Sequence, residues 1–326
     1  MQNQKIMFVE RQQARLVPEM VSIQPTPTQV VGKTLVSVVS SGSETGGYMD
    51  FFGGGQFPCP TGYAGVLEVI AVGNEVRGIT PGDRVFAQSN HQLISVMDQS
   101  DVIRVPNDMK SEHAVLCRFP AISMTTMIHT QIRPTEPVLV TGLGAVGLVC
   151  AQMMRHCGYD VCGVDPSPVR RGMAERCGIR HTCASLEDLG ELKGRFGLAM
   201  ECSGVDQAMI DAANYVRKGG ELSIVGVPWR RSSDTYAHTL FETIFMNYVK
   251  IYSGWEWSLP LHSADFFPNS NFHSFATAME WIRQGSIQVE GTFELFDPVN
   301  CSDIYRTIAN GKLETVFAIF DWRKYV

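Results

Sequence analysis

Hydrophobic and polar residues alternate in short runs over the first third of the chain, from about Lys5 to Pro106. These runs are rich in β-branched residues, and turn residues close them. They include LVSVV (35–39), VLEVIAVG (66–73) and RVFA (84–87), with Pro81-Gly82-Asp83 as a turn signal. The pattern predicts a compact β domain.

From Val138 to about Gly254 the pattern changes to nearly continuous apolar runs separated by segments of helical period. The strand candidates are 138–142, 160–165, 198–204, 221–227 and 249–254, and the helix candidates are 146–158, 168–178 and 206–220. Strands that are apolar throughout are covered on both faces, which predicts a parallel sheet built from βαβ units. The tail from about Gln288 is expected to add a strand, a short helix at 302–310 and a final strand at 315–322.

Composition narrows the class of protein. The 326 residues are 44% hydrophobic and 18% charged, which is typical of a soluble protein with two domains. The net charge is −6 and no basic patch stands out, so neither nucleic acid nor a membrane is an expected partner. The first residues do not have the pattern of a signal peptide, and the nine cysteines include no CxxC pair. We therefore expect a cytoplasmic protein with reduced thiols.

A glycine-rich segment, GSETGGYMDFFGGG (42–55), stands out in the β domain. We interpret it as a loop. Its aromatic residues Tyr48, Phe51 and Phe52 either tuck the loop onto the domain or form the wall of a substrate pocket, and the sequence leaves both alternatives open.

The strongest chemical motif is the GxGxxG sequence Gly142-Leu143-Gly144-Ala145-Val146-Gly147, which follows one strand candidate and opens a helix candidate. The first glycine permits a tight turn, the second admits a pyrophosphate and the third allows close packing of helix on strand. Phosphates would bind the free N–H groups of the helix N-terminus. The motif predicts a dinucleotide-binding site. We expect the second ligand of the protein to be a small-molecule substrate.

Asp165 ends the second strand candidate and can bind both ribose hydroxyls, which favours NAD(H), with NADP(H) as the alternative. Arg170 and Arg171 follow Ser167 and Pro168 in the first turn of a helix, and Arg170 is a candidate to contact the nucleotide. The predicted cofactor set is completed by Ala145 and Val146 in the motif and by Ser203 and Val227 in later strand candidates.

The run VLEVIAVGNEVRGITPGDRVF, the glycine motif, ECSG and the later GGELSIVG together resemble the medium-chain dehydrogenase/reductase superfamily over nearly the whole chain. The resemblance implies an α/β fold in which a Rossmann domain, a doubly wound parallel sheet, is inserted into a GroES-like β domain. We expect the Rossmann NAD(H)-binding domain at 118–285 and the GroES-like domain at 1–117 plus 286–326. The resemblance also implies a substrate cleft between the domains and a homodimer paired through Rossmann edges.

The sequence departs from the zinc-dependent alcohol dehydrogenases of this family. Their Gly-His-Glu motif is replaced by Gly62-Tyr63-Ala64, and their ligand cysteine by the turn 40–44 (SSGSE). The segment between Val85 and Val105, where the resemblance would place a four-cysteine zinc lobe, contains no cysteine. We expect no zinc site. The turn and the Gly-Tyr pair are weakly similar to the branch that includes bacteriochlorophyllide a dehydrogenase.

Without zinc, hydrogen-bond donors must stabilise charge on a carbonyl oxygen. Tyr63 takes the place of the family's histidine ligand and is the first candidate, with a space-filling role as its alternative. Ser43 matches the family's relay hydroxyl, within one residue of alignment. His91 is either a proton relay or a solvent-facing loop residue.

Three functions are consistent with the sequence. The first is interconversion of an alcohol and a carbonyl with NAD(H), the second is reduction of a C=C bond or a quinone, and the third is non-catalytic NAD(H) binding as a sensor or structural protein. The glycine motif and Asp165 resemble the alcohol-dehydrogenase side of the family, so we favour the first.

Overall fold

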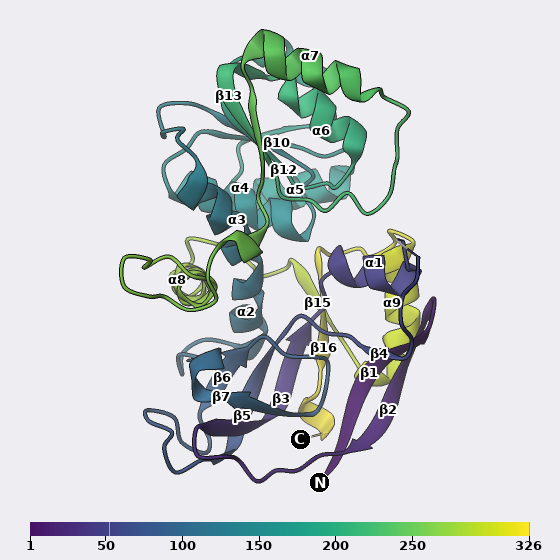
Figure 1. Ribbon diagram of the computed structural model, residues 1–326, viewed down its shortest axis with the longest axis vertical. Helices are drawn as coiled ribbons and strands as arrows, with labels where there is room; N and C mark the ends of the chain where they lie inside the picture. Colours follow the sequence, from purple (N-terminus) through teal and green to yellow (C-terminus); the bar gives the residue numbers. More distant parts are fainter. Residues whose placement is uncertain (52, 326) are drawn as a thin grey trace. The chain divides into compact units, whose positions relative to one another are not determined.

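The computed structural model describes residues 1–51 and 53–325. The chain divides into two compact units, Met1–Cys117 with Val289–Val326, and Arg118–Gln288. The second unit is inserted into the sequence of the first, so that both ends of the chain belong to the first unit (Figure 1).

A seven-stranded sheet forms the centre of the first unit. Its strands run in the order β15-β16-β3-β5-β6-β8, and β7 also pairs with β3. They are β3 (Gln29–Val38), β5 (Ala64–Val72), β6 (Arg84–Ala87), β7 (Ile94–Asp98), β8 (Val102–Arg104), β15 (Phe293–Phe296) and β16 (Phe317–Asp321). The three strand candidates of the first third coincide largely with β3, β5 and β6. Because β16 pairs antiparallel with β3, the C-terminal segment completes a sheet that the N-terminal segment begins.

A smaller sheet packs beside it, with the order β2-β1-β4. Its strands are β1 (Gln2–Glu10), β2 (Gln13–Met20) and β4 (Cys59–Pro60). The core between these sheets buries Phe8, Phe320 and Trp322 together with Tyr305 of α9 (Cys301–Ala309). Residues from both ends of the chain therefore share one hydrophobic core.

The prediction of a loop at 42–55 is wrong for the first half of this segment, because Ser43–Met49 form helix α1. α1 packs beside α9 (Figure 1). Tyr48 is 4% exposed, and its ring stacks on Tyr305 with centroids 5.7 Å apart and meets Phe8 edge-on at 5.5 Å. This burial holds the segment helical despite Gly46 and Gly47. Tyr48 is a core residue, not the wall of an open pocket.

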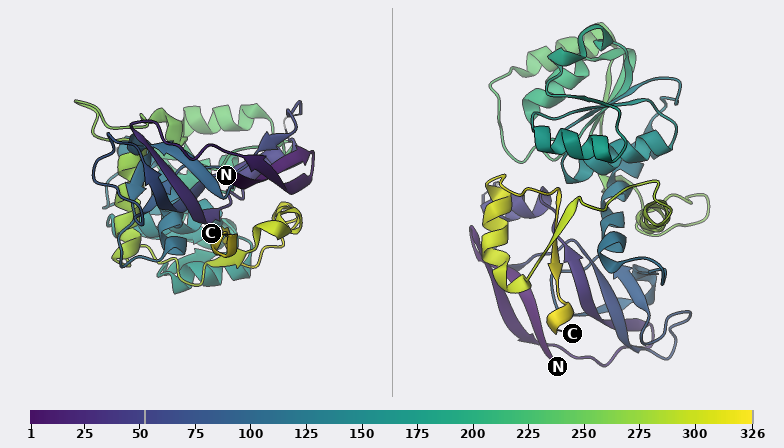
Figure 2. Two further views of the ribbon diagram at one scale, coloured as in Figure 1. Left: turned by 90° about the horizontal axis from the view of Figure 1, so that it is seen from below. Right: turned by 180° about the vertical axis from the view of Figure 1, so that it is seen from behind.

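The second unit is a six-stranded parallel sheet in the order β11-β10-β9-β12-β13-β14. Helices lie on both sides of these strands (Figure 2). The strands are β9 (Val138–Thr141), β10 (Val161–Val164), β11 (His181–Cys183), β12 (Phe196–Glu201), β13 (Val216–Ile224) and β14 (Lys250–Ser253). The helices are α3 (Arg118–His129), α4 (Ala145–His156), α5 (Pro168–Arg176), α6 (Asp206–Ala213), α7 (Ala237–Asn247) and α8 (Asn271–Arg283). Every residue of β9, β10 and β12 is buried, as expected for strands covered on both faces.

The helix predicted at 206–220 is too long. α6 ends at Ala213, and β13 begins at Val216, where the chain pairs with Phe196 of β12. Backbone hydrogen bonds to β12 and the burial of Val216 outweigh the helical spacing of the sequence in this stretch.

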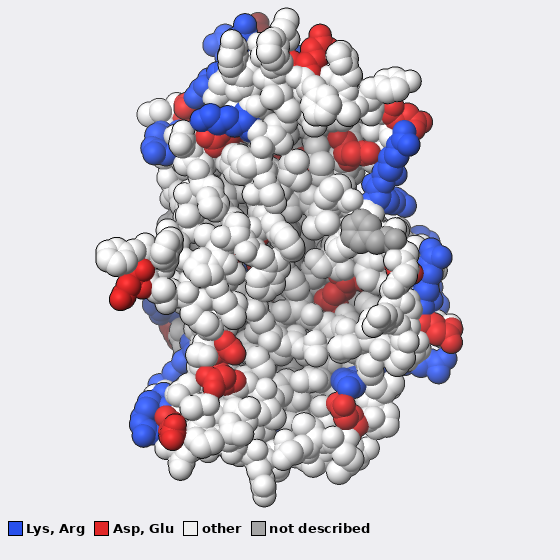
Figure 3. All heavy atoms as spheres, in the orientation of Figure 1, with Lys and Arg blue, Asp and Glu red and all other residues white. Residues whose placement is uncertain are grey.

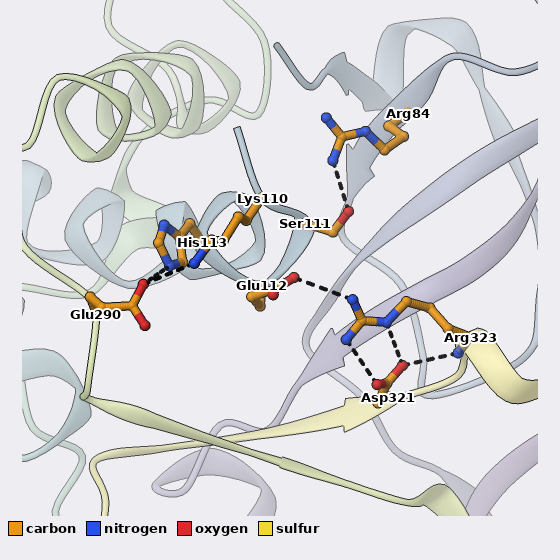
Figure 4. Close-up of polar contacts among 8 residues, drawn as sticks. All are labelled: Arg84, Lys110, Ser111, Glu112, His113, Glu290, Asp321 and Arg323. Atoms are coloured by element: carbon orange, nitrogen blue, oxygen red, sulfur yellow. Dashed lines mark hydrogen bonds and ion pairs between the residues drawn. The ribbon is translucent and has the colours of Figure 1, made fainter. Parts of the chain in front are cut away.

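Within the first unit, the segment before the inserted second unit contacts the segment that follows it through hydrogen bonds and ion pairs. Lys110 Nζ and His113 Nε2, at the start of α2 (Ser111–Ala114), lie 3.2 and 2.9 Å from one carboxylate oxygen of Glu290 (Figure 4). Glu112 of the same helix forms an ion pair with Arg323 at 3.7 Å. These contacts fix α2 on the first unit.

On the face shown in Figure 3 most of the surface is neither Lys or Arg nor Asp or Glu, and the charged side chains of both signs lie in small scattered groups. Over residues 1–51 and 53–325, no helix has both the length and the apolar character needed to cross a bilayer.

Candidate active site and nucleotide loop

The three glycines of the loop after β9 are required for different physical reasons. Gly142 has φ +79°, and a Cβ on it would lie 2.8 Å from the backbone of Ser203. A Cβ on Gly147 would lie 1.7 Å from the carbonyl oxygen of Gly142. Gly144 is different: the nearest atom to its Cβ position is Nη1 of Arg170, at 3.8 Å. Packing therefore requires glycine at 142 and 147, whereas the space beside the backbone of Gly144 is open to a ligand.

Gly144 is also the N-cap residue of α4, and no side chain among residues 1–51 and 53–325 caps this helix end. Glycine has no side chain that could accept hydrogen bonds from the first N–H groups of α4, which begin at Ala145 and Val146. An uncapped helix N-terminus carries partial positive charge and binds anions. This loop fits the phosphates of a dinucleotide.

Asp165, directly after β10, joins the loop to α5. One carboxylate oxygen accepts a hydrogen bond from the backbone nitrogen of Leu143 at 2.8 Å, and the other accepts from Ser167 at 2.8 Å. Nη1 of the half-exposed Arg170 lies 3.5 Å from the carboxylate. Asp165, Arg170 and Gly144 thus lie together at one end of the sheet.

Ser203 and Val227 lie on the loops after β12 and β13, at the same end of the parallel sheet. A Cβ on Gly204, next to Ser203, would lie 2.6 Å from the carbonyl oxygen of Val227, so the two loops are in close contact. The Ser203 hydroxyl donates to Glu201. The nine predicted cofactor residues therefore all belong to the second unit.

Glu201 is a functional candidate that the sequence reasoning missed, although ECSG contains it. Its buried carboxylate accepts from the backbone nitrogens of Ser203 at 2.7 Å and Gly204 at 3.1 Å. Burial raises the pKa of Glu201, and the hydrogen bonds from Ser203 and Gly204 offset only part of that rise. Glu201 shapes the loop that packs against Gly142.

In the first unit, the solvent-facing alternative for His91 is wrong. The side chain is 0% exposed, with Nδ1 2.7 Å from Ser37 Oγ and Nε2 3.2 Å from Glu44 Oε2. The core packs around it, with the ring of Phe320 edge-on at 5.0 Å between centroids. Both ring nitrogens are therefore bound within the protein.

Glu44 is the second residue that the sequence reasoning missed. Its carboxylate accepts hydrogen bonds from the hydroxyls of Thr61 and Tyr305, each at 2.5 Å, and from the backbone nitrogen of Ser40 at 2.7 Å. Burial on its own would raise the pKa of Glu44, but the interactions with His91, Thr61 and Tyr305 bring it below its usual value. We call Glu44 with Ser37, Thr61, His91 and Tyr305 the Glu44 hub.

The remaining predicted site residues of the first unit lie on segments that meet at this hub. Ser43 is the first residue of α1, one position before Glu44, and is exposed. Tyr63 is half-buried and follows Thr61 by two residues. Phe51 is half-buried just after α1, and Phe52 lies outside the described residues. The structure thus brings together the segments that carry Ser43, Tyr63 and His91.

The serine–histidine–carboxylate sequence of contacts in the hub does not form a hydrolytic site. Ser37 is 0% exposed, and its oxygen accepts a hydrogen bond from Trp322 Nε1 at 2.9 Å. A nucleophile must reach a substrate carbonyl, and this hydroxyl is enclosed by the core. The buried hub residues hold segments together, and the candidate residues Ser43 and Tyr63 lie next to the hub on those segments.

The donor set of this region does not fit zinc. The segments 40–44 and 62–64 offer hydroxyls, and the hydrogen bonds above already occupy the Glu44 carboxylate and both nitrogens of His91. Throughout the described part of the chain, no three His, Cys, Asp or Glu side chains gather in a way that could hold a metal ion. A tetrahedral zinc site needs at least three such ligands.

Comparisons with known proteins find a partial sequence match and a shared fold. A profile described as "Zinc-binding dehydrogenase" matches residues 145–266. L-threonine 3-dehydrogenase from Aeromonas hydrophila is 24% identical in a match that covers 58% of this chain and 66% of that protein. The alignment thus spans slightly less than two thirds of the relative.

Two solved structures match nearly the whole chain. Galactitol-1-phosphate dehydrogenase from Escherichia coli superposes with a TM-score of 0.81 at 18% identity, covering 98% of this chain and 99% of the other. A putative zinc-binding dehydrogenase from Sinorhizobium meliloti, bound to NADP, gives 0.79 at 15% identity with the same coverage. The fold is that of a Rossmann domain inserted into a GroES-like domain. The chain is thus similar to zinc-binding dehydrogenases in part of its sequence and shares the fold of these structures.

Proposed function

We propose that this protein is an NAD(H)-dependent oxidoreductase that interconverts an alcohol and a carbonyl by hydride transfer, without zinc. The observation that carries the proposal is the nucleotide loop. Of its three glycines, Gly144 is the one with open space at its Cβ position, it caps a helix N-terminus, and Asp165 lies at the end of the adjacent strand. The threonine dehydrogenase relative supports the reaction class.

The preference for NAD(H) rests on charge. A carboxylate at the end of β10 accepts hydrogen bonds from ribose hydroxyls and repels a 2′-phosphate. Arg170 opposes this, since its side chain is half-exposed and close enough to Asp165 to attract a phosphate. We propose that the buried Asp165 dominates, so that NADP(H) is used less well.

When bound, the nicotinamide supplies or accepts the hydride, and the protein must orient the substrate and stabilise charge on its oxygen. We propose that the Tyr63 hydroxyl donates a hydrogen bond to that oxygen, with the Ser43 hydroxyl as the second donor. Tyr48 is buried in the core and is no longer a candidate for the wall of the substrate pocket. Phe51 stays a candidate for the substrate pocket.

We propose independence from zinc because the donor chemistry of the first unit does not fit a zinc site. The matched family profile, residues 145–266, contains neither of the segments that correspond to the zinc ligands of the family, 40–44 and 62–64. The match to a zinc-binding family therefore does not argue for zinc in this chain.

We further propose a cytoplasmic homodimer. Its cysteines are free thiols, as in proteins of a reducing compartment. α7 exposes Phe241, Phe245 and Met246, which is costly in water and favours burial against a second copy. Light scattering of the purified protein tests this state, and a monomer across a dilution series contradicts it.

A substrate screen tests the reaction. Alcohols, ketones, enones and quinones are each offered with NADH or NADPH, or with the oxidised cofactors, and the absorbance of the reduced nicotinamide is followed. Turnover of alcohols or ketones with NAD(H) supports the proposal. Turnover confined to enones or quinones makes the protein a reductase of those compounds, and tight NADH binding without any turnover makes it a non-catalytic binding protein.

A further inference from the structure

We infer that Glu44 is a positioning residue: its buried carboxylate holds the Tyr63 segment and the Ser40–Ser43 turn in place, at the two positions where zinc-dependent relatives have metal ligands. The inference rests on the proposed function, because it concerns the geometry of the proposed oxygen donors. It assigns a role to a residue that is outside the chemistry itself.

Four donors from separate segments converge on this carboxylate. Ser40 donates from the backbone before α1, Thr61 from the segment after β4, His91 from the segment after β6, and Tyr305 from α9. Thr61 and Tyr305 are 17 and 261 residues from Glu44 in sequence. A single carboxylate therefore joins parts of the chain that have no local reason to meet.

The link to Tyr63 runs through Thr61 and Gly62. The carbonyl oxygen of Thr61 accepts a hydrogen bond from the backbone nitrogen of His91 at 2.8 Å. Gly62 has φ +143°, and a Cβ on it would lie 2.2 Å from that same nitrogen, so only glycine fits. Ala64 begins β5 and is 0% exposed. The Tyr63 backbone is thus fixed by the hub on one side and by the sheet on the other.

The link to Ser43 is equally short. The Ser40 backbone nitrogen donates to Glu44 Oε1 at 2.7 Å, and the Ser43 backbone nitrogen lies 3.4 Å from Ser40 Oγ. These bonds close the turn that begins α1. Both proposed hydroxyl donors are therefore carried by segments bonded to one carboxylate.

The hydrogen-bond directions within the hub favour an ionised Glu44. Trp322 Nε1 can only donate, so Ser37 Oγ accepts from it and can give its own hydrogen to His91 Nδ1. His91 Nε2 then carries a hydrogen that it donates to Glu44. Thr61 and Tyr305 also donate, which leaves the carboxylate as acceptor only. An ionised carboxylate supplied with four donors holds its partners strongly, since hydrogen bonds to charged groups are the stronger kind.

The test removes the Thr61 hydroxyl and compares it with another buried threonine. Thr61→Val deletes the hub's bond to the Tyr63 segment, and Thr61→Ser restores it. Thr292→Val is the matched control, because the Thr292 hydroxyl is equally buried in the first unit and donates to the Val289 carbonyl at 2.6 Å, outside the hub. Tm, kcat and KM are measured for each variant, with hydrogen exchange of residues 40–49 and 59–65.

Both valine variants should lower Tm. Only Thr61→Val should lower kcat, by about tenfold to a hundredfold as expected for a misplaced donor, with KM for NADH unchanged and with kcat regained in Thr61→Ser. It should also speed exchange in 40–49 and 59–65. A Thr61→Val enzyme with the kcat and exchange of the control overturns the inference and leaves the proposed function intact. Faster exchange in a protein that turns over none of the offered substrates overturns the proposed function and leaves the holding role of Glu44 standing.

Discussion

The Oδ2 atom of Asp165 lies 2.8 Å from the backbone nitrogen of Leu143, the residue between the first two glycines of the nucleotide loop. The acid at the end of β10 therefore helps to shape the loop after β9. A substitution of Asp165 changes both the charge near the ribose site and the support of the loop, and these effects can be separated.

Two variants of Asp165 separate them. Asp165→Asn removes the charge but keeps an oxygen for Leu143, whereas Asp165→Ser removes both. Each should shift the ratio of kcat/KM values towards NADPH by roughly tenfold, or about 1.4 kcal/mol. The serine variant should lose about 1–3 kcal/mol more unfolding free energy than the asparagine variant, because only asparagine keeps an acceptor for the buried Leu143 N–H, whereas both variants lose the acceptor of Ser167. A wild-type enzyme that already prefers NADPH by a large factor would rule out the proposed preference.

Substitution by alanine should affect cofactor binding at Gly144 and stability at Gly147. Gly144→Ala should leave Tm nearly unchanged and weaken NADH binding by roughly tenfold, about 1.4 kcal/mol, because its Cβ points into open space. Gly147→Ala should cost about 1–3 kcal/mol of unfolding free energy, because its Cβ would overlap the Gly142 carbonyl. Thermal unfolding and fluorescence titration with NADH measure the two effects. Equal loss of stability in both variants contradicts the open site at Gly144.

Zinc should be substoichiometric in the purified protein, well below one ion per chain. Incubation with a chelator should leave activity unchanged, since the donor set around Tyr63 and Ser43 does not fit a tetrahedral site. Elemental analysis and activity after chelation are the measurements. One zinc per chain, lost together with activity, would show that the ligands lie elsewhere.

Tyr63→Phe keeps the ring and deletes the hydroxyl. Loss of one preorganised donor typically costs about 10²–10³ in kcat, roughly 3–4 kcal/mol of transition-state stabilisation. NADH affinity should stay the same, because the nucleotide loop belongs to the second unit. Steady-state kinetics with the best substrate of the screen gives the answer, and a near-normal kcat reduces Tyr63 to a space-filling residue and favours Ser43 as the donor.

Glu44 should make stability depend on pH in the acid range. Its pKa in the folded protein is lower than the ordinary value of 4.5, so its contribution to stability is fully present above about pH 4.5. That contribution is lost as the pH falls towards the folded pKa. The Tm difference between wild type and Glu44→Gln should therefore be largest near neutral pH and shrink below about pH 4.5. A difference that is constant down to pH 3 would mean that Glu44 is not ionised in the folded protein.

The sequence by itself determined the parallel sheet and its nucleotide loop. β9, β10 and β12 are apolar along their whole length, and the glycine motif stands between β9 and α4. These signals are local: a strand covered on both faces, a tight turn and a helix start each leave their mark within a few residues. Asp165 could be assigned for the same reason, because its distance from the motif is set by one βαβ unit.

Only the tertiary structure decided the Glu44 hub, the helical state of 43–49 and the end of α6 at Ala213. In each case the deciding partner is remote in sequence. Tyr305 reaches Glu44 across 261 residues, Tyr48 packs on Phe8 and Tyr305, and Val216 pairs with Phe196. Hydrophobic periodicity records which face of a segment is buried, but not which distant donor or ring will cover it. For a buried carboxylate such as Glu44, that partner decides whether its charge can be held in the core.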